Sequence, residues 1–191
     1  MKQLLLIIIS ISLLFSCNRT TPQKALPSDS IFHLQSNWQN QYGDTLKLNK
    51  LRGKTLVVVM IYTSCKAACP LLIADMKQIE KQIDPSNLNK VSLVLVSIDP
   101  ETDTPEHLKE FAQTNKMDAA HWIFLRGNDV ATKEFANVLS MKYKKISPID
   151  FSHSNIISVF NSEGELVSQE EGTNINTEKV AKQVNSIAKT N

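Results

Sequence analysis

The chain has 191 residues, of which 42% are hydrophobic and 21% are charged. This length suits one ordinary hydrophobic core and is too short for two. The formal net charge is +2, and acids and bases are interspersed without a basic block. Because nucleic-acid binding needs a concentrated positive surface, the composition argues against nucleic acid as a partner.

The N-terminus has the composition of an export signal. Lys2 precedes an apolar run from Leu4 to Phe15, which is shorter than the about 20 apolar residues that a membrane-spanning helix needs. The residues that close this run, Leu14-Phe15-Ser16-Cys17, resemble the lipobox of bacterial lipoproteins. The resemblance implies a lipid on Cys17, whereas a plain cleaved signal or an uncleaved anchor would leave that cysteine incidental.

Three segments follow from this interpretation. We expect a lipoprotein signal peptide over residues 1–16 and a flexible tether over residues 17–30, because the latter are polar and contain two prolines. The folded domain is then expected over residues 31–191. A lipid on Cys17 would anchor this domain to a membrane of the cell envelope, facing the periplasm or another extracytoplasmic side.

Hydrophobic patterning predicts alternating strands and helices after the tether. Residues 56–62 form an apolar, β-branched run without alternation, which is typical of a strand buried on both faces. The segment 30–50, with Tyr42-Gly43-Asp44 at its centre, favours an additional N-terminal hairpin. The other predicted elements are a helix over 71–83, a strand over 91–98, a helix from Thr104-Pro105 to about 115, a strand over 122–125, a helix over 130–139, strands over 156–160 and 165–168, and a threonine-capped helix over 177–188.

This order of elements predicts an α/β fold with a central sheet between two layers of helices. It fits a thioredoxin-like three-layer fold, with the N-terminal β-hairpin as an extension and a hairpin plus a helix at the C-terminus.

Two cysteines stand four positions apart in the run T-S-C-K-A-A-C-P, at Cys65 and Cys69. A structural disulfide across so short a loop would contribute only about 2 kcal/mol to folding stability in the chain-entropy model. The pair is therefore better explained by the reactivity of its thiols. Pro70 restricts the preceding residue and predicts a helix start at about Cys69. The amide groups of a helix N-terminus favour a thiolate, and Lys66 adds positive charge. We therefore expect a reactive thiol pair, with Cys65 in the preceding loop.

A soft thiolate pair suits Cu(I), and an added imidazole would let the same site hold Cu(II). Zinc is the alternative metal, although structural zinc sites normally use four protein ligands and the chain offers no second pair of closely spaced cysteines. Of the four histidines, His153 precedes the predicted strand 156–160, whose start should face the cysteine loop in a thioredoxin-like order. His33, His107 and His121 carry no comparable signal.

Several motifs together resemble the Sco/SenC family. They are Gly53-Lys54 before a buried strand, Tyr62-Thr63-Ser64-Cys65 with Cys69-Pro70, the run from Asp99 to Pro105, and His153-Ser154 before a strand.

The resemblance implies a membrane-anchored, thioredoxin-like protein that binds one copper through Cys65, Cys69 and His153. It also implies a partner, the copper-accepting subunit of cytochrome c oxidase or of a similar cuproenzyme, and a role as a copper metallochaperone. Some family members instead act as thiol-disulfide oxidoreductases on the acceptor's cysteines, so enzymatic activity stays open. Asp99 and Asp103 match the family's acidic motif, which implies a role around the metal ligands, although turn formation or helix capping explains each aspartate equally well. Where the family often has aspartate before the ligand histidine, this chain has Ser152.

Overall fold

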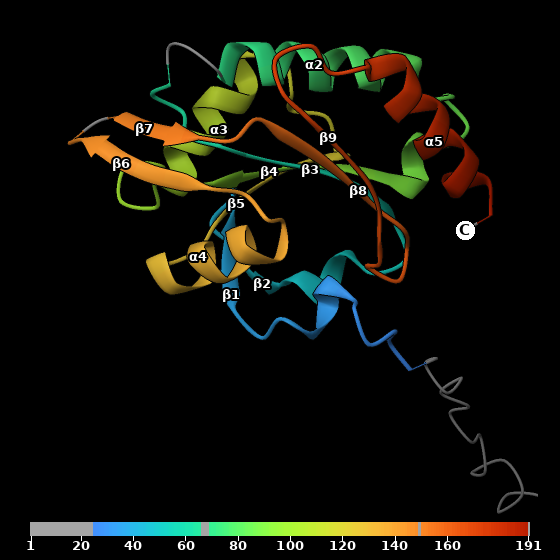
Figure 1. The fold of residues 1–191 in the computed structure, drawn as a ribbon, viewed down its shortest axis with the longest axis horizontal. Helices are drawn as coiled ribbons and strands as arrows, with labels where there is room; N and C mark the ends of the chain where they lie inside the picture. Colours follow the sequence, from blue (N-terminus) through green and yellow to red (C-terminus); the bar gives the residue numbers. More distant parts are fainter. Residues whose placement is uncertain (1–24, 66–68, 149, 191) are drawn as a thin grey trace, which may run out of the picture.

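A seven-stranded sheet runs through the centre of the molecule, with the strand order β2-β1-β5-β4-β3-β8-β9 (Figure 1). The computed structural model describes residues 25–65, 69–148 and 150–190. The strands of this sheet are β1 (Asn37–Asn40), β2 (Thr45–Lys47), β3 (Thr55–Ile61), β4 (Val91–Ser97), β5 (Trp122–Arg126), β8 (Ile156–Phe160) and β9 (Leu166–Glu171). A separate two-stranded sheet is formed by β6 (Tyr143–Ser147) and β7 (Asp150–His153).

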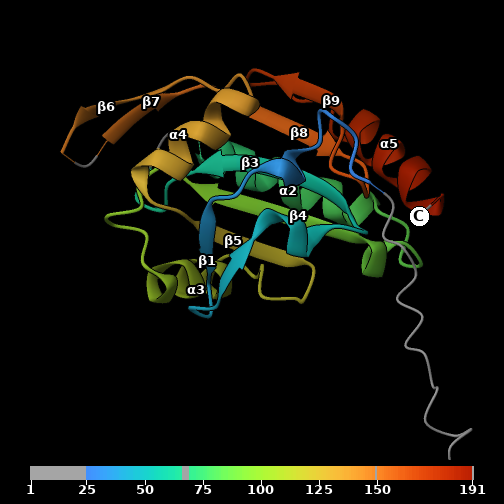
Figure 2. The same ribbon diagram turned by 90° about the horizontal axis from the view of Figure 1, so that it is seen from below.

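Helices cover both faces of the central sheet. The α-helices are α2 (Cys69–Gln82), α3 (Pro105–Thr114), α4 (Asp129–Val138) and α5 (Thr177–Lys189), and the short 3-10 helices are η1 (Ile31–His33), η2 (Leu48–Leu51) and η3 (Leu88–Lys90). The crossovers from β3 to β4 and from β4 to β5 step toward the same edge of the sheet, which places α2 and α3 on one face. Helix α5 packs on that face against α2, and α4 lies on the opposite face (Figures 1 and 2).

The buried centre of the sheet consists of β3 and β4, in which every residue is buried. They pair in parallel from Thr55 opposite Val91 to Ile61 opposite Ser97. Burial on both faces explains their continuous apolar sequence. Both strands end at the same edge of the sheet, where the cysteine loop leaves β3.

These observations confirm the predicted α/β, thioredoxin-like, three-layer fold, including the N-terminal hairpin of β1 and β2 and the C-terminal β8–β9 hairpin with α5. Two details were wrong. The residue that caps α5 is Asn176, whose side chain accepts a hydrogen bond from the backbone of Lys179, and not Thr177. The β6–β7 hairpin was not predicted, because four of the five residues of β6 are exposed and the strand has no apolar alternation.

The predicted signal peptide (1–16), Cys17 and the first part of the predicted tether (17–24) lie outside the described residues. At the end of the tether segment, Ser30 is buried, and its hydroxyl donates to the carbonyl of Glu163 in the β8–β9 turn. In the described part of the chain, no helix is both long enough and apolar enough to cross a membrane.

Candidate metal centre

Three potential metal ligands meet at the edge of the central sheet where β3 ends. The sulfurs of Cys65 and Cys69 and a ring nitrogen of His153 all lie within 4.8 Å of one another. His153 follows Cys69 by 84 positions, so only the fold brings these donors together. The three residues predicted from the sequence as metal ligands therefore form one cluster.

The cysteines occupy the two positions expected from Pro70. Cys65 lies in the loop after β3, where its amide donates to the carbonyl of Tyr62 at 3.2 Å. Cys69 is the first residue of α2 and is buried, and its amide donates to the Cys65 sulfur at 3.3 Å. Both are free thiols, and Cys65 is half-buried. The start of the helix thus holds the Cys65 sulfur beside Cys69. Lys66, between them, lies outside the described residues.

The protonation of Cys69 differs from the sequence-based expectation. Burial raises the pKa of the Cys69 thiol, although a hydrogen bond with the Tyr62 backbone acts in the opposite direction. Desolvation of the charged form therefore outweighs the favourable field of the helix N-terminus at this residue. A bound cation would supply the positive charge that the buried site lacks, because a thiol that coordinates a metal ion binds it as the thiolate and releases its proton to solvent.

His153 is held in one orientation by its own backbone neighbour. Its Nδ1 lies 3.1 Å from the carbonyl of Ser154, and since a carbonyl can only accept, Nδ1 is the donor of this hydrogen bond. Nε2 lies 3.7 Å from the Cys69 sulfur. The carbonyl thus provides the orienting contact that Ser152 cannot provide by charge. His153 ends β7 of the small hairpin, in addition to preceding β8 as the sequence indicated.

Tyr62 connects the cysteine loop to the histidine hairpin, a role that no sequence pattern predicted. Its hydroxyl donates to the Asp150 carboxylate and accepts from the Phe151 amide at 3.3 Å. Its ring meets the imidazole of His153 edge-on, at 5.9 Å between centroids. Burial and the Asp150 hydrogen bond raise the pKa of Tyr62, so that its hydroxyl stays protonated as a donor. One side chain at the end of β3 therefore fixes the position of β7.

The two aspartates of the acidic motif lie in different places. Asp103 is fully buried and accepts a hydrogen bond from the hydroxyl of Thr63, two residues before Cys65, at 2.5 Å. It also accepts from the hydroxyl of Ser97 at the end of β4 at 2.5 Å. Burial raises its pKa, although these hydrogen bonds oppose the shift. Asp103 thus ties the start of the cysteine loop to the sheet.

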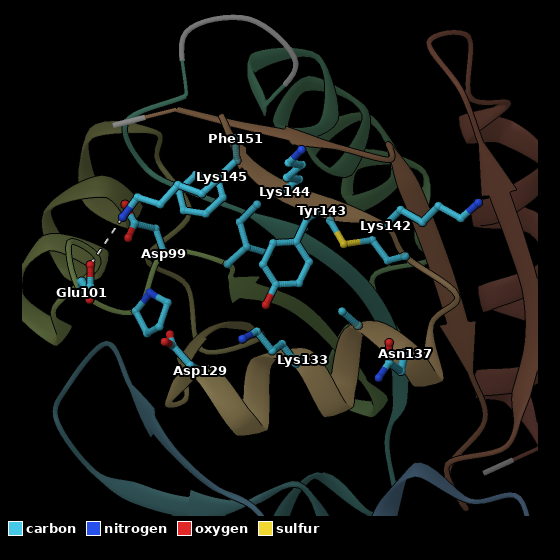
Figure 3. Close-up of a pocket in the computed structure, with 14 residues that line it drawn as sticks. Asp99, Glu101, Asp129, Lys133, Asn137, Lys142, Tyr143, Lys144, Lys145 and Phe151 are labelled. Carbon is cyan, nitrogen blue, oxygen red and sulfur yellow. Dashed lines mark hydrogen bonds and ion pairs between the residues drawn. The ribbon is translucent and has the colours of Figure 1, made fainter. Parts of the chain in front are cut away.

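Asp99 lies instead at a neighbouring cavity of about 590 Å³ between α4 and the β6–β7 hairpin (Figure 3). It is buried, and its backbone carbonyl accepts from the amides of Thr102 and Asp103, which makes it part of the turn before α3. One of its carboxylate oxygens has no hydrogen-bond partner among the described residues. The structure therefore gives Asp99 a place in the turn and the cavity wall.

The remaining histidines lie away from the cluster. Nε2 of His33 lies 2.8 Å from the carbonyl of Pro27, and Nδ1 of His107 lies 3.1 Å from the carbonyl of Thr102. Nε2 of His121 lies 2.6 Å from the Glu80 carboxylate on α2. Trp122 donates to the same carboxylate at 2.8 Å, so that Glu80 joins α2 to the start of β5.

Comparison with known proteins decides the family. The sequence profile of the SCO1/SenC family matches residues 28–189. The chain belongs to the SCO1/SenC family. The SCO1 protein homolog of Bacillus subtilis (strain 168) is 34% identical over 100 residues, which are 52% of this chain and 51% of that protein. The chain thus spans about half the length of this curated relative.

Solved structures of Sco proteins share the fold. The structure of Bradyrhizobium japonicum ScoI with copper bound has a TM-score of 0.68 and 21% identity, covering 80% of this chain and 96% of that one. A structure of BsSco, described as a member of the Sco family of cytochrome c oxidase assembly proteins with a disulfide switch, has a TM-score of 0.70 and 26% identity, covering 81% of this chain and 92% of that one.

The geometry of this Sco-family centre suits a metal ion with few ligands. Donors at about 2.0–2.3 Å from a shared ion, the range of nitrogen and sulfur ligands in zinc sites, are about 3.5–4 Å apart in a trigonal arrangement. The 3.7 Å between the Cys69 sulfur and His153 Nε2 fits this spacing. Two soft sulfurs and one imidazole form the donor type that copper prefers. Within the described part of the chain, this cluster has no fourth Cys, His, Asp or Glu ligand, which makes a structural zinc site a poorer fit.

Proposed function

We propose that this chain is a copper metallochaperone that binds one copper ion through Cys65, Cys69 and His153. It delivers the copper to a subunit of cytochrome c oxidase or of a similar cuproenzyme. It does so while a lipid on Cys17 tethers it to a membrane of the cell envelope, with the folded domain on the periplasmic or another extracytoplasmic side. Copper is the cargo of this activity.

The observation that carries the proposal is the convergence of two sulfurs and one imidazole nitrogen within 4.8 Å, from segments far apart in the sequence. Structural roles for the cysteines would not require a histidine whose Nε2 lies 3.7 Å from the Cys69 sulfur. Family membership and the copper held by ScoI of Bradyrhizobium japonicum support copper as the metal.

The residues of this chain suggest how the cargo is held and released. Cys65 and Cys69 bind Cu(I) as thiolates, and His153 completes the site. His153 is half-buried and belongs to the small β6–β7 sheet, so it is the ligand that an acceptor can replace first. Transfer then needs only ligand exchange, without a change of oxidation state.

Two parts of this proposal, the delivery target and the membrane tether, are supported by different observations. BsSco is described as a member of the Sco family of cytochrome c oxidase assembly proteins, and we extend this role to the present chain by family membership. The tether rests on the lipobox-like run that ends at Cys17, a residue outside the described part of the chain.

A competition titration tests the copper site. Reduced protein should take one Cu(I) per chain from a chromophoric chelator, whereas Cys69→Ala and His153→Ala should bind far more weakly. His107→Ala is the matched control, since this histidine lies on α3 and contacts the carbonyl of Thr102. Stoichiometric, tight binding by His153→Ala would count against the three-ligand site.

The second candidate function is a thiol-disulfide oxidoreductase of the cell envelope, which reduces cysteines of the acceptor protein. It is favoured by the two free thiols, whose sulfurs lie side by side, with Cys65 the more exposed. The Cys65 thiolate would attack the substrate disulfide, and Cys69 would then release the reduced substrate by forming a Cys65–Cys69 disulfide. Turnover of a disulfide substrate that persists in His153→Ala would favour this function over copper delivery.

A further inference from the structure

The β6–β7 hairpin carries an uneven distribution of charge next to His153. Strand β6 and the residue before it contribute three exposed lysines, Lys142, Lys144 and Lys145, whereas β7 contributes one acid, Asp150. We call the three lysines the basic hairpin surface. The net charge of the whole chain is only +2, so this hairpin is a local concentration of positive charge.

Most of this charge is not neutralised within the protein. Lys145 lies 3.4 Å from the exposed carboxylate of Glu101, a pair that solvent weakens. Lys142 and Lys144 have no ion-pair partner in the described part of the chain. Figure 3 shows Lys142 on the side of the neighbouring cavity away from Asp99, Glu101 and Asp129. The Asp150 carboxylate is engaged by the Tyr62 hydroxyl.

Two of these lysines lie beside His153, the potential metal ligand that the hairpin carries. A hollow of about 260 Å³ is lined by Lys142, Tyr143 and Lys144 together with Ser152, His153 and Ser154. Tyr143 pairs directly with His153 across the two strands, and Lys144 pairs with Ser152. A group that enters the hollow therefore comes close to two unneutralised lysines as well as to His153.

We propose that the basic hairpin surface is the docking site for the copper acceptor, and that the acceptor presents an acidic surface around its own copper ligands. This inference rests on the proposed function and adds the chemistry of the partner. Charge complementarity would orient the acceptor so that its first ligand meets copper from the His153 side. The exposed apolar side chain of Ile146 near the hairpin tip would lie within the same contact.

An acidic protein fits this surface better than an anionic membrane. Transfer requires the acceptor's ligands to approach His153, and a lipid surface held by Lys142 and Lys144 would cover the hollow in which His153 lies. A lipid surface would therefore oppose copper delivery.

Copper transfer to two synthetic peptides tests the proposal. Each peptide has the same two cysteines, flanked in one peptide by four glutamates and in the other by four lysines. The donor is the full chain in phosphatidylcholine vesicles, with Cys17→Ser so that Cys65 and Cys69 are its only thiols. During transfer the bonds from copper to His153, Cys65 and Cys69 break, bonds to the two peptide sulfurs form, and the peptide's thiol protons pass through water to the freed protein sulfurs.

The glutamate-flanked peptide should accept Cu(I) on the order of tenfold faster at low salt, within the range of electrostatic steering, and added salt should reduce the difference. The double variant Lys142→Glu, Lys144→Glu should reverse the preference. The matched control is Lys50→Glu, Lys182→Glu, which makes the same change in net charge at exposed positions on η2 and α5 and should keep it. Equal rates for both peptides, or a preference that survives in the hairpin variant, would overturn the proposal.

A second measurement needs no copper, which separates this inference from the proposed function. The apo thiols attack the dianion 5,5′-dithiobis(2-nitrobenzoate) and release thionitrobenzoate, or attack the dication cystamine and release cysteamine. The hairpin variant should lose the preference for the dianion on the order of tenfold, and the control should not. If copper binding fails but this preference holds, the metallochaperone function is refuted. The result would still support a basic hairpin surface that attracts anions. If copper binds and neither assay depends on Lys142 and Lys144, only the docking proposal is refuted.

Vesicles containing phosphatidylglycerol distinguish a lipid surface from a protein. Transfer to the glutamate-flanked peptide should stay as fast as in phosphatidylcholine alone. A loss of transfer that the hairpin variant restores would assign these lysines to the membrane and contradict the proposal. Equal thermal unfolding midpoints of the hairpin and control variants would exclude misfolding as the cause of any difference.

Discussion

The hydroxyl of Tyr62 lies where the cysteine loop and the histidine hairpin meet. Replacing it in Tyr62→Phe removes the hydrogen bonds to Asp150 and Phe151 and keeps the ring against His153. We expect a loss of about 1–2 kcal/mol in the free energy of unfolding. Because residues that orient ligands typically change metal affinity by about 10-fold or more, we also expect copper affinity to fall about 10-fold. Urea denaturation and chelator competition measure the two effects.

Tyr143→Phe is the matched control for this prediction. Tyr143 lies on the same hairpin, and its hydroxyl points into the neighbouring cavity. This variant should bind copper as the unchanged protein does. Equal copper affinities of the Tyr62→Phe and Tyr143→Phe variants would show that Tyr62 does not position His153.

Asp103 predicts a pH-dependent contribution to stability. Burial raises its pKa in the folded protein above the ordinary value of 3.8. The folded state therefore holds the proton more tightly, so this contribution is fully present below pH 3.8 and is lost as the pH rises through the folded-state pKa. The stability of the unchanged protein minus that of Asp103→Asn should accordingly decrease over this window. Urea denaturation of both proteins from pH 3 to 7 tests this, and a difference that rises with pH would contradict the assignment.

At the scale of elements, the β8–β9 hairpin depends on one glycine. Gly164 has φ +81°, and an added Cβ would lie 2.7 Å from the Ser30 hydroxyl and 2.8 Å from the Phe32 ring. Gly43, in the β1–β2 turn, has nearly the same φ of +84° but open space around it. Gly43→Ala should therefore show only the cost of the left-handed backbone, about 1–2 kcal/mol.

Gly164→Ala should cost about 1–3 kcal/mol more than Gly43→Ala, because it adds overpacking against η1 to the same backbone strain. The free energy of unfolding in urea measures both variants, and copper binding by the folded proteins should not change. If the two substitutions cost the same, the packing of residues 30–32 on this turn contributes nothing measurable.

The central elements could be predicted from the sequence, whereas the hairpin that carries His153 could not. Strands β3 and β4 are buried on both faces, and their apolar runs are visible in the sequence. Thr104 and Pro105 begin α3 as their cap and first-turn preferences require. The β6–β7 hairpin lies outside the central sheet, and the Phe151 side chain is its main buried anchor. Because so few of its side chains are buried, the hairpin produces no periodic hydrophobic pattern in the sequence.

At the scale of the whole molecule, the candidate site joins the loop after β3, the start of α2 and the end of β7. The cysteine positions follow from local rules, since Pro70 determines where α2 begins. The contact of Tyr62 with Asp150 spans 88 positions, and the raised pKa of Cys69 comes from its burial in the folded protein. Neither could be predicted without the packed structure.

Copper bound across these segments should stabilise the entire fold. A ligand that binds only the folded state adds about 4 kcal/mol when its free concentration is a thousand times its dissociation constant. Chelator-buffered Cu(I) should therefore raise the unfolding midpoint of the reduced protein, and Cys69→Ala should lose most of this increase. An unfolding midpoint that does not respond to Cu(I) would indicate that the three donors do not bind it in the folded protein.

The most direct test of the three-ligand site is the X-ray absorption spectrum of the reduced protein loaded with one Cu(I). We expect a coordination shell of two sulfurs and one imidazole nitrogen, with the nitrogen contribution lost in His153→Ala and retained in His107→Ala. A shell of sulfur alone, or one that is unchanged in His153→Ala, would contradict this expectation.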